Sequence, residues 1–171
     1  DIYNQRFQYF KSSSHVLDTV ATAHANVYRL FTWMPNYTED QINKAAQEIN
    51  QTVDGATAEL KTLAAQAGLS GEEQKLLDAS LGHIVRYRKS VVLAIDLASV
   101  DPNTGMSAMQ TADDAFETLH ASARTLVALE EKLARQSYET SASAYHRTLA
   151  LASMILVGAI GASLFISLFM A

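Results

Sequence analysis

The chain has 171 residues, a formal net charge of -5 and no cysteine. An acidic chain with scattered Lys and Arg lacks the positive surface that nucleic-acid binding needs, and the absence of cysteine excludes disulfides, Cys-type zinc sites and a cysteine nucleophile. Only 7 glycines and 2 prolines are present, too few for the turns of sheets, so the composition favours long helices.

The first two predicted helices carry apolar stripes with the three- and four-residue spacing of packed helices. Pro35 ends the first helix, because the residue before a proline avoids the α conformation. Thr38 and Gln41 form a capping box that begins the second helix, and Gly68 is placed to end it. The second stripe runs from Ile42 to Ala67. The first stripe consists of Phe7, Phe10, Ser14, Leu17, Ala21, His24, Tyr28 and Phe31.

Two further helices follow. Ser70 and Glu73 form a second capping box that begins the third helix, and residues 101–105 (DPNTG) predict a turn after it. No proline or glycine interrupts residues 106–157, so the fourth helix is predicted to be continuous. The third stripe is Leu77, Leu81, Ile84, Arg88, Val91, Ile95 and Ala98, and the fourth is Met109, Phe116, Leu119, Ala123, Leu126 and Leu133.

Short connections between long helices predict an all-α, antiparallel up-down-up-down four-helix bundle over residues 1–147. The 24 residues 148–171 carry no charge. At about 1.5 Å per residue they span about 36 Å, enough to cross a hydrocarbon core of about 30 Å, so we expect the fourth helix to continue into a transmembrane helix. The chain starts at Asp1 without Met or a signal peptide. We therefore expect a fragment of a longer protein. Because the fourth helix of an up-down-up-down bundle descends into the membrane, the first helix rises from it, and we expect another membrane helix just before Asp1.

Three features carry a resemblance to a known family of proteins. The first is a bundle placed between two membrane helices. The others are the segment HANVYRLFTW at 24–33 and the junction SYETSASAYHRTLALASMILVGAI at 137–160. Over its whole length the chain resembles the extracytoplasmic ligand-binding domain of bacterial methyl-accepting chemotaxis receptors. The resemblance implies residues 1–147 in the periplasm, residues 148–171 in the inner membrane, a homodimer, and a small-molecule ligand such as an amino or organic acid. It also implies that the fourth helix transmits the signal to a cytoplasmic region.

Two alternatives remain open at this point. The same sensor could serve a histidine kinase or a cyclic-dinucleotide enzyme, since the output would lie beyond Ala171. A non-sensory, membrane-anchored bundle is the other alternative, and it would favour a fully apolar core.

Arg88 is the main candidate for ligand binding, because an unpaired guanidinium on an apolar stripe would be costly. His24 lies at a comparable depth on the first helix, with Tyr28 one turn away. We expect a pocket for an anion, in which Arg88 contacts a carboxylate and Tyr28 donates a hydrogen bond. Tyr87, beside Arg88, is also assigned to the ligand-binding residues. Alternatively, Arg88 reaches past small neighbours to solvent, or pairs with an internal acid such as Asp113.

A second candidate cluster is formed by Arg29 and Trp33, four residues apart near the end of the first helix. In the aspartate-receptor type of the resembled family, arginines on this helix and polar residues early in the fourth helix bind ligand across the dimer interface. Arg29 and Thr111 match those locations by position. Alternatively, a solvated Arg29 stacks on Trp33.

Metal-dependent and catalytic chemistry is not expected. Glu117 and His120 form one Glu-x-x-His, whereas di-iron sites in helical bundles need two copies and further inward glutamates. His83 and His120 do not share the core position that axial haem ligands would need. With no phosphate-binding loop and no nucleophile beside a base, we predict a protein that is not an enzyme and has no metal or cofactor.

Overall fold

A computed structural model describes the backbone of residues 2–170 and the side chains of residues 4–159, except those of 144 and 146. All elements in this part of the chain are helical, which confirms the predicted all-α class. The four long helices are α1 (Ile2–Trp33), α2 (Glu39–Ala64), α3 (Gly71–Val100) and α4 (Pro102–Met170), and the short 3-10 helix η1 (Met34–Asn36) follows α1.

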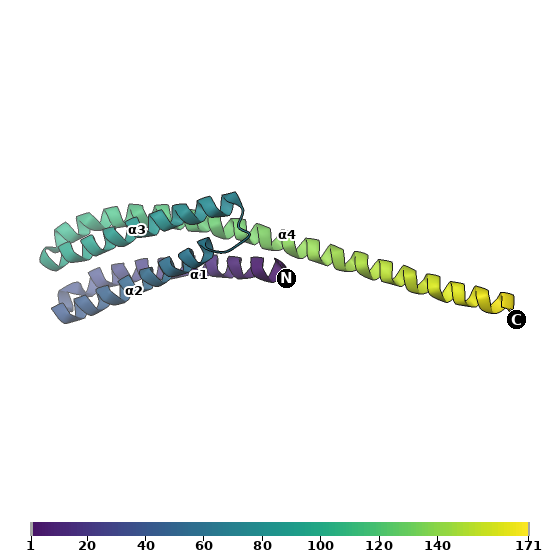
Figure 1. Cartoon of the computed structure of the whole chain (residues 1–171). Coiled ribbons are helices and arrows are strands. Elements are labelled where there is room, and N and C mark those ends of the chain that lie inside the picture. The colour runs from purple at the N-terminus through teal and green to yellow at the C-terminus, as the bar shows by residue number, and fades with distance from the viewer. Residues whose placement is uncertain (1, 171) are drawn as a thin grey trace.

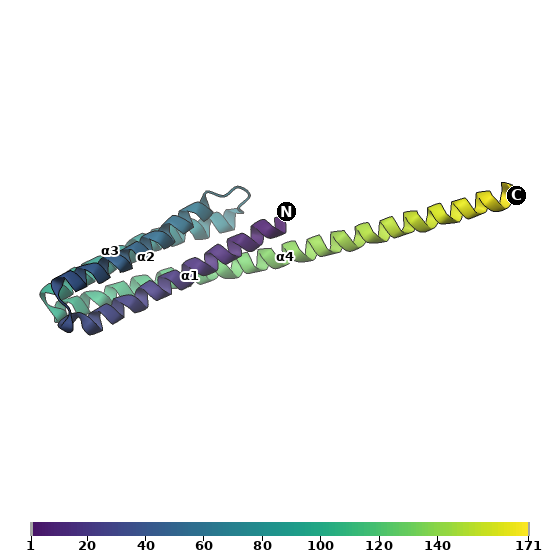
Figure 2. The same cartoon turned by 90° about the horizontal axis from the view of Figure 1, so that it is seen from below.

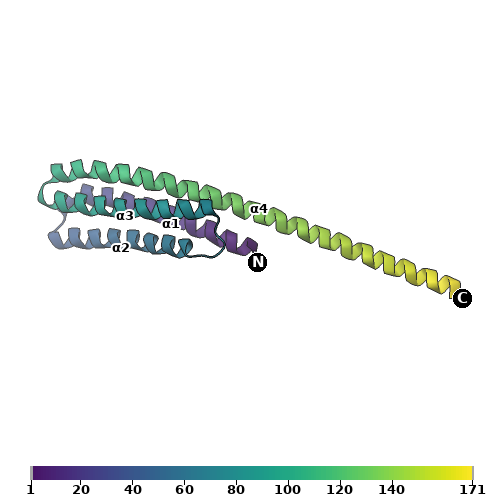
Figure 3. The same cartoon turned by 45° about the horizontal axis from the view of Figure 1, so that its top comes forward.

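The helices lie side by side, and α4 extends far beyond the other three (Figure 1). Each helix packs against the next in the order α1, α2, α3 and α4, and α4 packs back against α1. The α1–α2 and α3–α4 connections lie at one end of this helical body (Figures 1 and 2). The α2–α3 connection and the start of α1 lie at the other end, where α4 leaves the body (Figure 3).

Both predicted capping boxes are confirmed. The Gln41 backbone N–H donates to the Thr38 hydroxyl at 3.3 Å, and the Thr38 N–H donates to the Gln41 side chain at 2.8 Å. Ser70 and Glu73 form the equivalent pair at the start of α3. Gly68 lies between α2 and α3 with a φ of 83°, a backbone conformation that favours glycine. These local signals set where α2 and α3 begin.

The predicted turn at 101–105 is wrong, because α4 already begins at Pro102. The Asp101 carboxylate accepts hydrogen bonds from the backbone N–H groups of Asn103 and Thr104. Proline suits the first helical position, since its missing N–H would have no partner there. The reversal between α3 and α4 is therefore confined to Asp101.

α3 and α4 approach each other closely at this reversal. A Cβ atom on Gly105 would collide with both the side chain and the backbone of Ala98. Glycine is therefore required at position 105 for this packing.

The stripe predicted for α1 is wrong by one residue, which rotates the helix by about 100°. The residues that are buried are Tyr9, Ser13, Val16, Val20, Ala23, Val27, Leu30 and Met34. Phe7 and Tyr28 of the predicted stripe lie at the surface instead, 43% and 42% exposed. The stripe predicted for α2 is confirmed at Ile49, Val53, Ala56, Leu60 and Leu63.

On α3 the predicted stripe is only partly right. Leu77, Ile84, Val91, Ile95 and Ala98 are buried as expected, and Ser80 and Tyr87 take the interior positions predicted for Leu81 and Arg88. On α4 the buried positions include Met109, Leu119, Ala123 and Leu126 as predicted, together with Ala112, Ala115, Glu130 and Ala134.

Beyond the helical body, α4 continues without interruption, so no break in the helix marks the predicted boundary at residue 147. Leu149, Met154, Ile155 and Val157 are 46% to 72% exposed. Of the residues whose side chains are described, none belongs to a helix with the length and apolar character to span a bilayer. The part of the predicted span from residue 160 to residue 171 lies outside the described side chains.

Candidate ligand-binding site

His24 is the centre of a polar and aromatic cluster contributed by three helices. Its ring stacks on Phe116 of α4, with 3.8 Å between ring centroids and an interplanar angle of 4°. The Nδ1 atom lies 3.2 Å from the hydroxyl of Tyr87 on α3, and Nε2 lies 3.4 Å from Oδ1 of Asp113 on α4. Tyr28 donates a hydrogen bond of 2.5 Å to Oδ2 of Asp113. The structure therefore brings His24 and Tyr28 together, but with Tyr87 beside them in place of the expected Arg88.

The carboxylate in this cluster is provided by Asp113, not by a ligand. Burial lowers the pKa of His24, although the negative charge of Asp113 acts in the opposite direction. The hydrogen bond to Asp113 raises the pKa of Tyr28 to about 12, and burial raises the pKa of Tyr87 above its ordinary value. At neutral pH the cluster holds a neutral imidazole and one internal carboxylate. It has no spare positive charge for an external anion.

The inward position predicted for Arg88 is wrong. Arg88 donates two hydrogen bonds to Asp54 of α2, at 2.6 and 3.1 Å, and both side chains are about half exposed. Tyr87, which is fully buried, takes the interior position instead. An aromatic ring with a hydroxyl can be buried when that hydroxyl finds a partner, whereas the guanidinium of Arg88 keeps one face in water. The proposed anion pocket around Arg88 is therefore not formed.

A groove of about 430 Å³ lies between α1 and α2, near the end of the body that carries η1. Apolar side chains, Leu30 from α1 and Ala45 and Ile49 from α2, line part of it. The polar residues that line it are Asn26, Arg29, Tyr37, Gln41, Lys44, Glu48 and Thr52. A volume of this size suits a small molecule of few heavy atoms.

The charges of this groove make it the better candidate site. Among the ion pairs between described residues, none involves Arg29 or Lys44. Glu48 adds one negative charge to the same lining. The groove therefore combines two cations that are free to contact an anion with one acid that can contact a cation.

The remaining predicted residues of the second cluster do not join this groove. Trp33 is 51% exposed, and in the described part of the chain Arg29 does not stack on its ring. Thr111 is exposed on α4 and is not one of the residues that line the groove. Of the predicted ligand-binding residues, Arg29 is thus the one that the α1–α2 groove contains.

Sequence reasoning missed Lys44 and Glu48, which the structure places beside Arg29. A signal was present, because Lys44 and Glu48 continue from Gln41 of the capping box at helical spacing and flank the buried stripe of α2. The sequence did not show that Arg29 of α1 faces this row.

Comparison with protein-family models, curated proteins and solved structures gave no match. Within the described side chains, no three His, Asp or Glu residues come together in a group that could hold a metal ion.

Proposed function

We propose that the chain is the sensory part of a transmembrane receptor of the chemotaxis-receptor type, and that its α1–α2 groove binds a small molecule with a carboxylate group. The observation that carries this proposal is that Arg29 and Lys44 line the same groove, and neither forms an ion pair with an acidic side chain of the described residues. Arginine can bind a carboxylate through two parallel hydrogen bonds, and the lysine ammonium can add a third.

An amino acid fits this groove better than a simple organic acid. Its carboxylate would contact Arg29 and Lys44, while its ammonium group would contact Glu48. Leu30 and Ile49 offer an apolar surface for a side chain. A few convergent polar groups on a partly apolar lining are typical of small-molecule sites.

The wider architecture that we propose is an antiparallel up-down-up-down bundle in the periplasm, anchored in the inner membrane by residues 148–171 and paired with a second copy. Its support is the placement of the inter-helix connections at opposite ends and the uncharged sequence of residues 148–171. The exposed apolar side chains of α4 beyond the body also support it, because large exposed apolar patches need a cover.

The continuity of α4, which contributes to the helical body and extends to Met170, supports the proposed signal transmission through this helix. A ligand can shift the packing of α4 only if it binds one packing more tightly than another. The groove lies between α1 and α2, and α1 packs against both α2 and α4. The effect of a bound ligand on α4 would therefore pass through α1.

Isothermal titration calorimetry with the standard amino acids and small dicarboxylic acids tests the proposal. For a ligand found in this panel, Arg29→Ala and Lys44→Ala should each weaken binding by at least about tenfold, since a hydrogen bond to a charged group is worth about 1.5–3 kcal/mol. Glu48→Gln should weaken the binding of amino acids but not the binding of dicarboxylic acids. Lys89→Ala, which removes an exposed cation outside the groove, is the matched control.

Arg88→Ala should also leave the affinity unchanged, because Arg88 is paired with Asp54 outside the groove. Equal affinity in wild type, Arg29→Ala and Lys44→Ala would rule out the α1–α2 groove as the binding site.

A further inference from the structure

Two glutamates are buried against each other at the end of the helical body where α4 leaves it. Glu73 of α3 is 0% exposed and Glu130 of α4 is 1% exposed. Each carboxyl group is close enough to the other to affect its titration. A hydrogen bond between them requires a proton on one, because two carboxylates have only acceptors. The pair is therefore suited to hold one proton in the interior.

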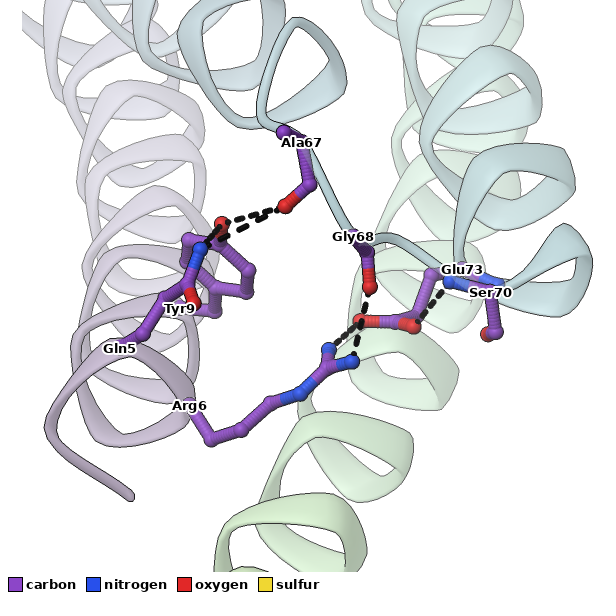
Figure 4. A network of polar contacts seen from close by, with 7 residues as sticks. All are labelled: Gln5, Arg6, Tyr9, Ala67, Gly68, Ser70 and Glu73. Atoms are coloured by element: carbon purple, nitrogen blue, oxygen red, sulfur yellow. Dashed lines mark hydrogen bonds and ion pairs between the residues drawn. The ribbon is translucent and has the colours of Figure 1, made fainter. Parts of the chain in front are cut away.

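Glu73 is the partner that carries the negative charge. Its Oε2 accepts a hydrogen bond of 2.6 Å from the backbone N–H of Ser70, and its Oε1 forms an ion pair with Arg6 of α1. Arg6 also donates to the carbonyl of Gly68, 3.0 Å away. Figure 4 shows Arg6 between Gly68 and Glu73. Burial by itself would raise the pKa of Glu73, but the bonds from Ser70 and the charge of Arg6 lower it.

Glu130 has the opposite environment. Its Oε2 atom has no hydrogen-bond partner among the described residues. The charged groups that act on it are Glu73 from α3 and Arg6 from α1, and α2 contributes none within the described chain. Burial and the charge of Glu73 raise the pKa of Glu130 to about 7. The proton of the pair therefore resides on Glu130.

We propose that Glu73 and Glu130 form a proton-binding site that controls how tightly α4 packs against α3 where α4 leaves the body. With the proton present, Glu130 donates to Glu73 and joins the two helices. When the proton is lost, two negative charges face each other in the interior with Arg6 as the single cation, and a buried charge without a partner is strongly unfavourable. Separation of α4 from α3 would admit water and relieve this repulsion.

The position of Glu130 supports a role beyond filling space. It continues the row of buried residues formed by Leu119, Ala123 and Leu126 on the inner side of α4, where an apolar side chain would pack without this penalty. The site does not depend on the α1–α2 groove, because none of its residues lines that groove. The proton effect is therefore expected without any ligand.

The absence of cysteine allows a direct test on the full chain. Lys75→Cys on α3 and Lys132→Cys on α4 replace exposed residues two positions beyond Glu73 and Glu130, and both can carry spin labels. In detergent without added amino acids, we expect the interlabel distance to be constant at acidic pH and to increase by several ångströms up to pH 8. The midpoint should lie near the pKa of Glu130, about 7. Glu130→Gln, which keeps a donor but cannot ionise, should hold the short distance throughout.

A second variant decides the question if Glu130→Gln does not fold. Glu73→Gln removes the like charge, so the midpoint should move to lower pH by about one unit. Glu131→Gln, at the exposed neighbouring position, should behave as wild type. An unchanged wild-type distance from pH 5 to 8 would overturn the proposal. So would the same midpoint in wild type, Glu130→Gln and Glu73→Gln. Arg29→Ala should leave the midpoint unaltered, which separates this result from ligand binding in the groove.

Discussion

The buried carboxyl pair predicts an unusual dependence of stability on pH. The pKa of Glu130 rises from an ordinary value of about 4.5 in the unfolded chain to about 7 in the fold. One pKa unit corresponds to about 1.4 kcal/mol, so keeping Glu130 ionised in the fold costs about 3 kcal/mol. A raised pKa means that the fold binds the proton more tightly. The stabilising effect is therefore complete below pH 4.5 and is lost as the pH rises to about 7.

Glu130→Gln should remove this loss. We expect wild type and variant to have similar free energies of unfolding at pH 5, because Gln also carries a donor. At pH 8 the variant should be more stable by about 2–3 kcal/mol. Urea unfolding of the full chain in a mild detergent, followed by circular dichroism, measures both values. Glu131→Gln removes an exposed ion pair with Arg135, with 3.8 Å between its charged atoms, and should change stability by less than about 1 kcal/mol.

Two other groups, His24 and Glu73, also make stability depend on pH, and the comparison of wild type with the Glu130→Gln variant accounts for their contributions. The lowered pKa of His24 means that its contribution is present above the ordinary value of 6.5 and is lost as the pH falls through the folded value. The pKa of Glu73 is also lowered, so its stabilising contribution is present above the ordinary value of 4.5 and is lost as the pH falls below it. The His24 contribution is common to wild type and variant, and the titration of Glu73 lies below the pH 5 to 8 window, so the difference between the two proteins in that window reports on Glu130. Parallel stability curves from pH 5 to 8 would refute the reasoning.

Two further predictions follow from single contacts. Gly105→Ala should lower the free energy of unfolding by about 1–3 kcal/mol, because the added methyl group would collide with Ala98. Gly82→Ala, where nothing lies within 4 Å, should raise it by up to about 1 kcal/mol in the same urea assay, and equal effects of the two would contradict the close approach. Asp113→Asn should lower the pKa of Tyr28 from about 12 towards 10, since the hydrogen bond to Asp113 is the main cause of the shift. An unchanged titration of Tyr28 by NMR would contradict this.

The helical elements were largely predictable because their signals are local. The capping boxes at Thr38 and Ser70 each involve residues three positions apart, and Gly68 supplies the backbone conformation that favours glycine after α2. The turn predicted at 101–105 was wrong for a local reason as well. Its proline and aspartate are equally typical of a helix start, and the sequence pattern did not distinguish the two.

The sequence by itself determined the all-α class, the beginnings of α2 and α3 and the buried stripe of α2, because helical spacing and caps depend on residues a few positions apart. Tertiary structure decided which of two adjacent stripes on α1 and α3 faces inward, since both are mainly apolar and only the neighbouring helices select between them. That choice, a rotation of about 100° per residue, moved Arg88 to the surface and Tyr87 to the interior. It also brought Glu73 and Glu130, 57 positions apart in the sequence, into contact, because contacts between helices depend on how the chain packs and not on spacing along it.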